Sequence, residues 1–134
     1  MVVSMESGSV EKLFVAATVI GGAVALDMEV DVYLLLGGAR AFRKDVAGTD
    51  KAVWDYPQLR SEMEEGLQRN AIADPFTSLR KLKQDGNVHI HACSTAGKIW
   101  GATQLSDFID LVDDLVGVGE YVIRCGEAES LQLL

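Results

Sequence analysis

Short apolar segments that favour strands alternate along this chain with segments that favour helices, and this order most constrains the fold. The first such segment, 1–6, reads MVVSME and precedes a helical stretch that ends near Ala25. Strand-like residues return at 29–36, as EVDVYLLL, and again at 87–92. Strands that alternate with helices are typical of a parallel sheet with helices on its faces. The sequence therefore predicts an α/β fold, a mainly parallel sheet sandwiched by helices in a three-layer, flavodoxin-like architecture.

Capping residues mark where several of the helices begin. Ser9 is a candidate N-cap of the first helix, and Asp74, followed by Pro75, is one for a helix that ends near Gly86. Ser106 is a candidate N-cap of a short helix with early aspartates. The other expected elements are a strand that stops at Gly37–Gly38, an irregular stretch over 39–56 with one helical turn, a polar helix over 58–70, a short helix that ends near Trp100, and a last strand over 130–134.

The segment 119–128 fits either a strand or a helix. Tyr121, Ile123 and Cys125 alternate as in a strand, whereas the same segment also places Tyr121, Val122 and Cys125 on one helical face. A helix is preferred, because the apolar residues after it can then form the last strand.

The first helix is apolar on nearly every side. Its core, 13–26, is too short to span a membrane comfortably, and Glu6 and Glu11 precede it where a signal peptide would carry basic residues. A helix of this kind is expected to be covered by the sheet or by another subunit. Gly21 and Gly22 lower its helix propensity, which predicts that another backbone packs closely there.

The bulk composition narrows the class of protein. A chain of 134 residues is expected to form one domain, and a net charge of −8 argues against nucleic acid or an anionic membrane as a partner. Two cysteines do not form a disulfide scaffold at this length. Free thiols are typical of a reducing compartment, so the sequence predicts a cytoplasmic protein. Residues 104–134 carry six of the eight net negative charges. A solvated face is the favoured interpretation of that acidity, and a docking surface for a basic protein is the alternative.

The segment 88–101, VHIHACSTAGKIWG, carries the strongest functional signal. A strand pattern delivers Cys93 to a Ser-Thr-Ala-Gly sequence that favours the start of a helix. A thiol there faces free backbone N–H groups and the positive end of a helix dipole, which stabilise the reactive thiolate. The pattern therefore predicts sulfur chemistry at Cys93, and a buried, inert cysteine is the alternative.

This segment resembles the DsrE/DsrF-like sulfurtransferase family, which has the YchN-like fold. The resemblance centres on Ala92–Cys93–Ser94 and the downstream Gly101. Weaker similarities in the opening strand, the first helix and the EVDVYLLLGG segment extend it over nearly the whole chain. His89 and His91 depart from the family pattern, and the segment 39–72, where a partner-recognition loop is expected, has no matching motif.

The resemblance implies a sulfur-accepting role for Cys93. It also implies a homo-oligomer, a trimer or a multiple of one. The implied partner is a small sulfur-carrier protein, or else a low-molecular-weight thiol or sulfur species.

Other side chains near Cys93 are candidates for supporting roles. Ser94 and Thr95 are expected either to bind an anionic sulfur species or simply to cap a helix. Gly37 and Gly38 lie at the end of another strand, where they form either a shared substrate pocket with Cys93 or an ordinary turn.

The two histidines and the second cysteine have less specific signals. A protonated His91 would favour the thiolate of Cys93 if it lay nearby, and a structural role is the alternative. The His89-x-His91-x-Cys93 spacing is too wide to hold one small ion easily, so no metal and no cofactor are predicted. Cys125 is expected to be a core residue, with a resolving-thiol role as the alternative.

The sequence thus predicts a sulfurtransferase or sulfur-carrier protein that holds sulfane sulfur or thiosulfonate on Cys93. The alternative is a non-catalytic oligomeric protein that senses a metal or a redox signal through this thiol.

Overall fold

In the computed structural model, which describes all of residues 1–134, five parallel strands form one sheet in the order β4-β3-β2-β1-β5. The strands are β1 (Val2–Met5), β2 (Val30–Leu34), β3 (Val88–Cys93), β4 (Asp114–Val116) and β5 (Leu131–Leu133). The helices are α1 (Val10–Ala25), α2 (Leu36–Ala41), α3 (Arg60–Arg69), α4 (Pro75–Asp85), α5 (Ser94–Ile99) and α6 (Val118–Glu127), with short 3-10 turns η1 (Pro57–Leu59) and η2 (Leu105–Asp107). The predicted parallel α/β architecture is confirmed.

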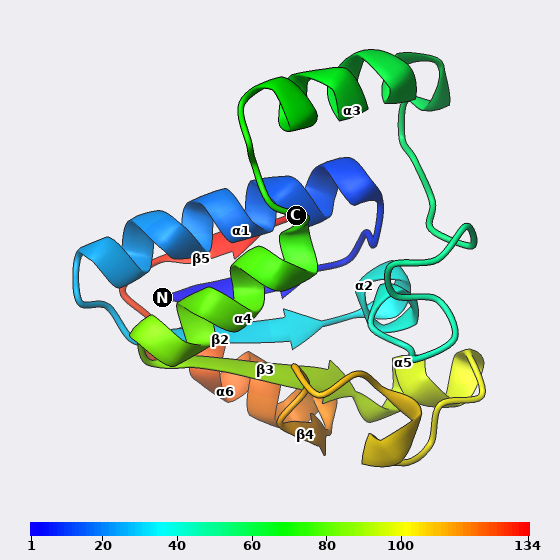
Figure 1. Cartoon of the computed structure of the whole chain (residues 1–134). Helices are drawn as coiled ribbons and strands as arrows, with labels where there is room; N and C mark the ends of the chain where they lie inside the picture. Colours follow the sequence, from blue (N-terminus) through cyan, green and yellow to red (C-terminus); the bar gives the residue numbers. More distant parts are fainter.

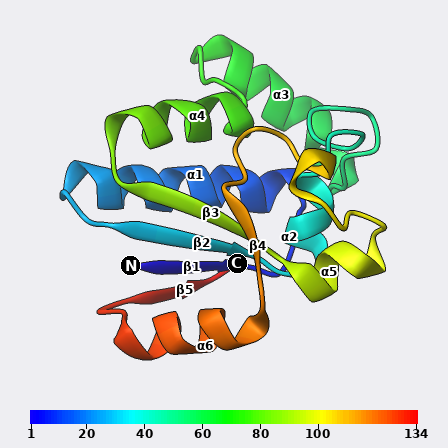
Figure 2. The same cartoon turned by 90° about the horizontal axis from the view of Figure 1, so that it is seen from below.

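The helices form layers on both sides of the sheet (Figures 1 and 2). Helices α1 and α4 pack together on one face, whereas α6 alone covers the other. Helices α2 and α5 lie next to each other beyond the carboxyl ends of β2 and β3. Helix α3 stands away from the sheet. No helix is both long enough and apolar enough to cross a membrane.

The strand register places alternate side chains on opposite faces of the sheet. Along β2, Val30, Val32 and Leu34 join a cluster of 23 buried residues that also contains the buried side chains of α1. Tyr33 belongs instead to a cluster of three buried residues, against which Tyr121 and Cys125 of α6 pack. One face is therefore a large apolar core, and the other holds a much smaller one.

Several predicted helix boundaries are confirmed by their caps. The Ser9 hydroxyl accepts a hydrogen bond from the Lys12 N–H at the start of α1. Asp74 accepts hydrogen bonds from the Phe76 and Thr77 N–H groups at the start of α4. The ambiguous segment near the C-terminus is helical, as α6, and the following residues form β5 beside β1. The polar segment over 58–70 forms α3 after one 3-10 turn.

After residue 100, one prediction is wrong and one strand was not predicted. Ser106 does not cap a helix but lies inside η2, where Gln104 and Asp107 form the capping box. The strand β4 was not expected from the sequence. It has three residues, which is too short for an alternating pattern to be visible, and its position is set by pairing with β3.

The predicted strand over 29–36 ends earlier than expected. Leu34 is its last residue, and Gly37 and Gly38 lie within α2 instead of forming a turn. A side chain at Gly38 would collide with the Met5 carbonyl, and one at Gly37 would come within 2.9 Å of the Glu6 carbonyl oxygen. The two glycines are needed because α2 packs directly on the end of β1.

The glycine pair in α1 behaves differently. A side chain at Gly21 would meet only the Leu82 side chain, at 3.8 Å, and one at Gly22 would meet nothing within 4 Å. The expected close approach of another backbone at Gly21–Gly22 is therefore not made within this chain. Helix α1 is instead covered by the sheet and by α4.

Candidate functional site

Cys93 is the last residue of β3 and the N-cap of α5, as the sequence predicts. Its side chain is a free thiol that is half-buried against the edge of the large apolar cluster. Backbone N–H groups in the first turn of a helix have no partner within the helix, so this position offers donors to an anion. Ser94 is half-buried and Thr95 is exposed in that same first turn.

Helix α5 is short, and contacts at its far end fix its position. The Trp100 indole donates a hydrogen bond to the Leu36 carbonyl oxygen at 2.8 Å, and the Arg43 guanidinium donates one to the Trp100 carbonyl oxygen at 2.6 Å. Gly101 has a φ of +71°, which glycine adopts without strain, and the chain turns there. The hydrogen bond from Trp100 therefore ties α5 to the start of α2.

The structure places α2 and α5 side by side. A cleft with a volume of about 1040 Å³ lies beneath α3, and none of Gly37, Gly38 and Cys93 lines it. The glycines already have a structural role in the packing of α2 on β1. A substrate-binding role for them stays a prediction.

His91 lies two residues before Cys93 and is buried between two carboxylates. Its Nδ1 atom is 2.6 Å from the Asp114 carboxylate, and its Nε2 atom is 3.3 Å from that of Asp31. Burial alone would lower the pKa of His91, but these two hydrogen bonds outweigh it and hold the pKa above its ordinary value. The imidazole is thus stabilised in its charged form.

Asp31 is the centre of this network. It is buried in β2, and the Arg124 guanidinium of α6 donates hydrogen bonds to it, one of them from Nε at 3.0 Å. Burial raises the pKa of Asp31, but the hydrogen bonds from Arg124 and His91 outweigh it and lower the pKa overall. Asp31 therefore remains ionised and binds two cationic side chains from different elements.

This arrangement bears on the predicted activation of Cys93. Both ring nitrogens of His91 bond to carboxylates, so neither is free to bond to the thiol. The two carboxylates also offset the positive charge of the ring. His91 therefore has a structural role, because its bonds connect β3 to β2 and β4. An effect of His91 on the Cys93 thiolate stays a prediction.

The His-x-His-x-Cys series does not converge on one point. His89 is exposed and lies 2.8 Å from the Asn87 side-chain oxygen, and its ring stacks on that of His91 at 6.4 Å between centroids. No group of three or more His, Cys, Asp or Glu side chains is arranged to hold a metal ion.

Cys125 lies on the side of α6 that faces the sheet. It is half-buried and packs against the cluster of Val2, Tyr33 and Val116. The neighbouring Tyr121 hydroxyl accepts a hydrogen bond from the buried Ser4 hydroxyl at 2.7 Å. These contacts give Cys125 the packing role that the sequence predicts.

Most acidic side chains of the C-terminal region have partners within the chain. Asp110 pairs with Arg80, Asp113 with Lys83, Asp114 with His91, and Glu127 with Arg124, while Asp107 accepts hydrogen bonds from the backbone. Only Glu120 and Glu129 of the seven have no ion pair or hydrogen bond through the side chain. Most of the acidity of this region is therefore paired within the chain, and a docking role for it stays a prediction.

Sequence reasoning missed Asp31, Asp114 and Arg124. One signal was present, because Asp31 interrupts the apolar strand EVDVYLLL, and a carboxylate in such a strand needs a partner. The identity of that partner was not visible, since Arg124 lies 93 residues away in the sequence.

Comparisons with known proteins support the fold. No family profile and no curated protein sequence matches the chain. A solved structure of MTH1491, a protein of unknown function from Methanobacterium thermoautotrophicum, is similar with a TM-score of 0.59 and 17% identity, over 99% of this chain and 96% of that one. The YchN protein of E. coli is similar with a TM-score of 0.59 and 15% identity, over 99% of this chain and 97% of its own. This chain therefore has the YchN-like α/β fold.

Proposed function

We propose that this protein is a sulfurtransferase or sulfur carrier that holds sulfur covalently on Cys93. One observation carries the proposal: a free, half-buried thiol lies at the carboxyl end of a parallel strand and at the first turn of a helix. In open α/β sheets ligands bind beyond the carboxyl ends of the strands. The YchN-like fold agrees with the family resemblance of the segment around Cys93.

The transfer needs no external oxidant or reductant. The Cys93 thiolate attacks the outer sulfur of a persulfide donor, R–S–SH, and the bond between the two donor sulfurs breaks. The donor leaves as the thiolate R–S⁻, and Cys93 keeps the outer sulfur as a persulfide. An acceptor thiolate then attacks that same sulfur, and the Cys93 thiolate leaves.

The groups around Cys93 have supporting roles in this proposal. Backbone N–H groups of Ser94 and Thr95 stabilise the thiolate and the bound persulfide, because both are anionic in the reactive form. The acceptor is a thiol on a small sulfur-carrier protein or on a low-molecular-weight compound. A thiosulfonate group on the same sulfur is the other form of cargo that fits this site.

A homo-oligomer, a trimer or a multiple of one, is part of the proposal. The outer face of α6 exposes Val118, Val122 and Ile123, each at about 60% exposure, and β5 adds exposed Leu131 and Leu133. Val118 and Val122 are one helical turn apart, and exposed apolar side chains that lie together are typical of protein interfaces. Light scattering at micromolar concentration should give a multimeric mass, and a monomeric mass would contradict this part.

The test is sulfur loading measured by intact mass. After incubation with polysulfide, the wild-type protein should gain the mass of one sulfur atom, and dithiothreitol should remove it. Cys93→Ser should abolish the gain, whereas Cys125→Ser, which removes the packed thiol, should retain it. Loading of the Cys93→Ser variant would overturn the proposal.

Limiting iodoacetamide distinguishes the two thiols without any sulfur donor. Cys93 should be alkylated several-fold faster than Cys125, because Cys93 lies at the first turn of α5, where free backbone N–H groups favour its thiolate, whereas Cys125 lies within α6. Faster alkylation of Cys125 would assign the reactive thiol to α6 instead of the end of β3. Measuring the metal content of untagged protein tests the alternative function, a metal sensor. That alternative predicts a stoichiometric metal ion that is lost in Cys93→Ser.

A further inference from the structure

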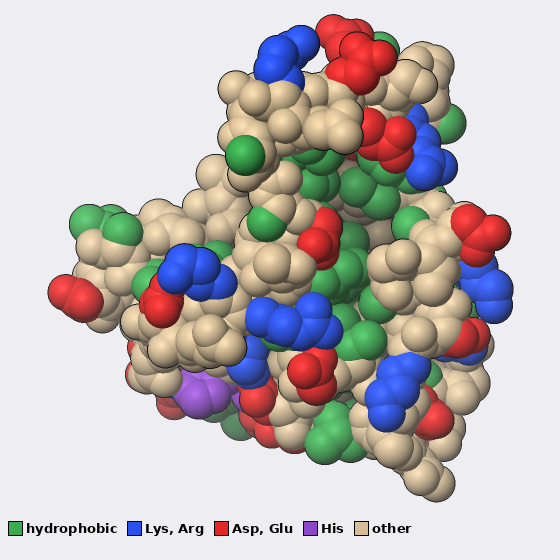
Figure 3. All heavy atoms as spheres, viewed as in Figure 1, with side chains coloured by type: hydrophobic (Ala, Val, Ile, Leu, Met, Phe, Trp, Pro, Cys, Tyr) green, Lys and Arg blue, Asp and Glu red, His purple; other side chains and the backbone are tan.

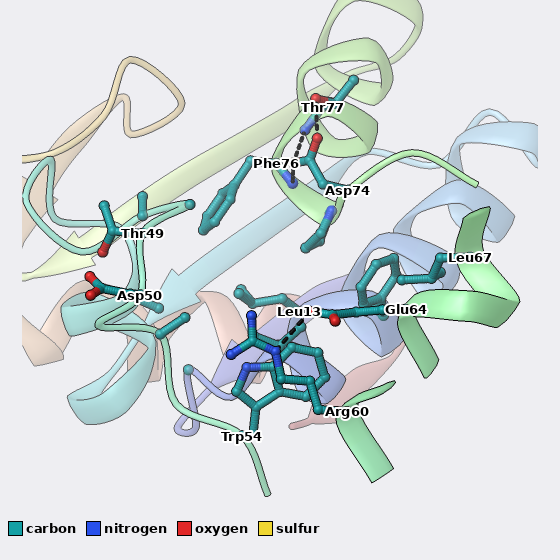
Figure 4. Close-up of a pocket in the computed structure, with 18 of the residues that line it drawn as sticks. Leu13, Thr49, Asp50, Trp54, Arg60, Glu64, Leu67, Asp74, Phe76 and Thr77 are labelled. Atoms are coloured by element: carbon teal, nitrogen blue, oxygen red, sulfur yellow. Dashed lines mark hydrogen bonds and ion pairs between the residues drawn. The ribbon is translucent and has the colours of Figure 1, made fainter. Parts of the chain in front are cut away.

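A large hollow lies beneath α3, away from Cys93. It has a volume of about 1040 Å³, and its wall includes Leu13 and Phe14 of α1, Phe76 of α4, the loop at 46–54 and one side of α3. Figure 3 shows its apolar floor open to solvent below α3, and Figure 4 shows Leu13 and Phe76 on its inner wall. Small-molecule pockets usually have volumes of about 300–1,000 Å³, so this cleft lies above that range.

The roof of the cleft is not packed on the rest of the chain. No side chain from Asp55 to Asp74 is buried, although this segment includes the whole of α3. Its two ends are held: the Glu11 carboxylate accepts hydrogen bonds from the Asp55 and Tyr56 N–H groups, and Asp74 caps α4. The helix between them leaves Leu67 half-exposed on the cleft wall. Apolar surface is therefore present on both sides of an unfilled space.

The charges around the cleft are unbalanced. Four carboxylates line it, from Asp50, Glu64, Glu65 and Asp74, against two guanidinium groups, from Arg60 and Arg80. Both guanidinium groups are already paired inside the chain. Arg60 donates a hydrogen bond to Glu64 at 2.7 Å and lies over the Trp54 ring (Figure 4), and Arg80 pairs with Asp110 at 2.8 Å.

Two of the carboxylates have no such partner. Asp50, on the loop, and Glu65, on α3, make no ion pair and no side-chain hydrogen bond, and both are exposed. The free charge at the rim of the cleft is therefore negative, above an apolar floor.

We propose that this cleft binds a basic amphipathic helix from a partner protein. Such a helix would place its apolar face on the half-buried Phe14 and Leu67 and on the exposed Ile72. Its Lys or Arg side chains would lie beside Asp50 and Glu65. In this mode of recognition an amphipathic helix lies in an apolar groove. The bound helix would also cover the side of α3 that lines the cleft. The proposal does not depend on the chemistry of Cys93, since Cys93 does not line the cleft.

A second copy of this chain is a poorer occupant. The helix that exposes the most large apolar side chains is α6, and it carries Glu120 and Glu127 against one arginine. Those carboxylates would meet the acidic rim of the cleft. A basic partner has the complementary charge.

The probe is a fluorescently labelled synthetic peptide with leucines on one helical face and lysines on the other, titrated into the full chain and followed by anisotropy. We expect saturable binding. Asp50→Asn combined with Glu65→Gln should weaken it roughly three- to tenfold, since exposed charge pairs contribute modestly. Leu67→Ser should weaken it to a similar extent, and none of these side chains is buried, so the fold should be kept.

Matched controls separate specific docking from general attraction to an acidic protein. Glu120→Gln combined with Glu129→Gln removes two other unpaired carboxylates and should leave binding within about twofold of wild type. A peptide of the same composition in scrambled order should bind at least tenfold more weakly. Equal weakening by both pairs of substitutions, or equal binding of the scrambled peptide, would overturn the proposal. A change of oligomeric mass in the Leu67→Ser variant would also overturn it, because the cleft would then be filled by a second copy.

Discussion

The two faces of the sheet use the same three central strands in different ways. Toward α1 and α4, β2 presents Val30, Val32 and Leu34 to a core of 23 buried residues. Toward α6, the same strand presents Asp31 and Tyr33, and the buried apolar cluster has three members. The first face is stabilised by apolar area, which carries no charge, whereas the second depends on ionised groups. The stability of the second face should therefore depend on pH and that of the first should not.

The difference also concerns specificity. Apolar contacts on the α1 side are numerous and non-directional, whereas α6 is held by directional bonds from Arg124 to Asp31 and Glu29 and by the bond between Ser4 and Tyr121. A helix of ten residues that buries no side chain completely needs such bonds to define its position. The α6 face thus buries less apolar area than the α1 face, but its directional bonds define the position of α6 on the sheet.

The largest effect is expected on the apolar face. Ile90→Ala should lower the free energy of unfolding by about 2–5 kcal/mol, because Ile90 is fully buried and its removal leaves a cavity. Urea denaturation at pH 5, 7 and 9 should give the same loss at each pH. Leu26→Ala, at a residue 75% exposed, is the control and should cost less than about 0.5 kcal/mol. A loss for Ile90→Ala that changes with pH would break the contrast between the faces.

A smaller effect is expected when the centre of the polar network is neutralised. Asp31→Asn should cost about 2–3 kcal/mol at pH 7, because it removes charge-assisted hydrogen bonds to Arg124 and His91 inside the sheet. Asp110→Asn is the matched control, since it removes an exposed carboxylate that also pairs with an arginine. It should cost below about 1 kcal/mol. Similar losses for the two variants would show that burial adds nothing to the Asp31 interactions.

The pH dependence of unfolding should identify His91. Its pKa is raised in the folded state, so its contribution is complete below about pH 6.5 and is lost as pH rises through the folded value. The pKa of Asp31 is lowered, so its contribution is complete above about pH 4 and is lost as pH falls through its folded value. The network should therefore stabilise most between about pH 4 and 6.5.

His91→Gln tests this assignment. It should cost about 1–2 kcal/mol near pH 6 and less as pH rises through the folded pKa of the wild-type imidazole, which is raised. His89→Gln, at the exposed neighbour, should retain the wild-type profile. A decline of stability at alkaline pH that persists in His91→Gln would assign the dependence to another group.

The smallest effect is expected at the contact between Ser4 and Tyr121. Tyr121→Phe removes the hydroxyl to which the buried Ser4 hydroxyl donates, and it should cost about 0.5–1.5 kcal/mol. Tyr56→Phe, at an exposed tyrosine with no side-chain hydrogen bond, should have no measurable effect. Combining Tyr121→Phe with Ser4→Ala should recover part of the loss, because no buried hydroxyl is then left without a partner. If the loss in the double variant equals the sum of the losses in the two single variants, the hydrogen bond between Ser4 and Tyr121 does not contribute to the stability of the α6 face.

The sequence by itself determined the order of most elements and the position of the thiol. The apolar segments of β1, β2 and β3, the caps Ser9 and Asp74, and the placement of Cys93 between a strand and a helix all follow from local patterns. These features depend on periodicity and on capping chemistry within a few residues, so they are visible without tertiary contacts.

Only the tertiary structure decided which distant residues meet. The bonds from His91 to Asp31 and Asp114, with the bonds from Arg124 to Asp31, bridge four elements. The strand β4 forms because β3 offers it a parallel edge. The glycines of α2 are explained by the end of β1, and the cleft by the position of α3 above α1 and α4. Contacts between residues tens of positions apart are set by packing of the whole sheet, and no local pattern contains them.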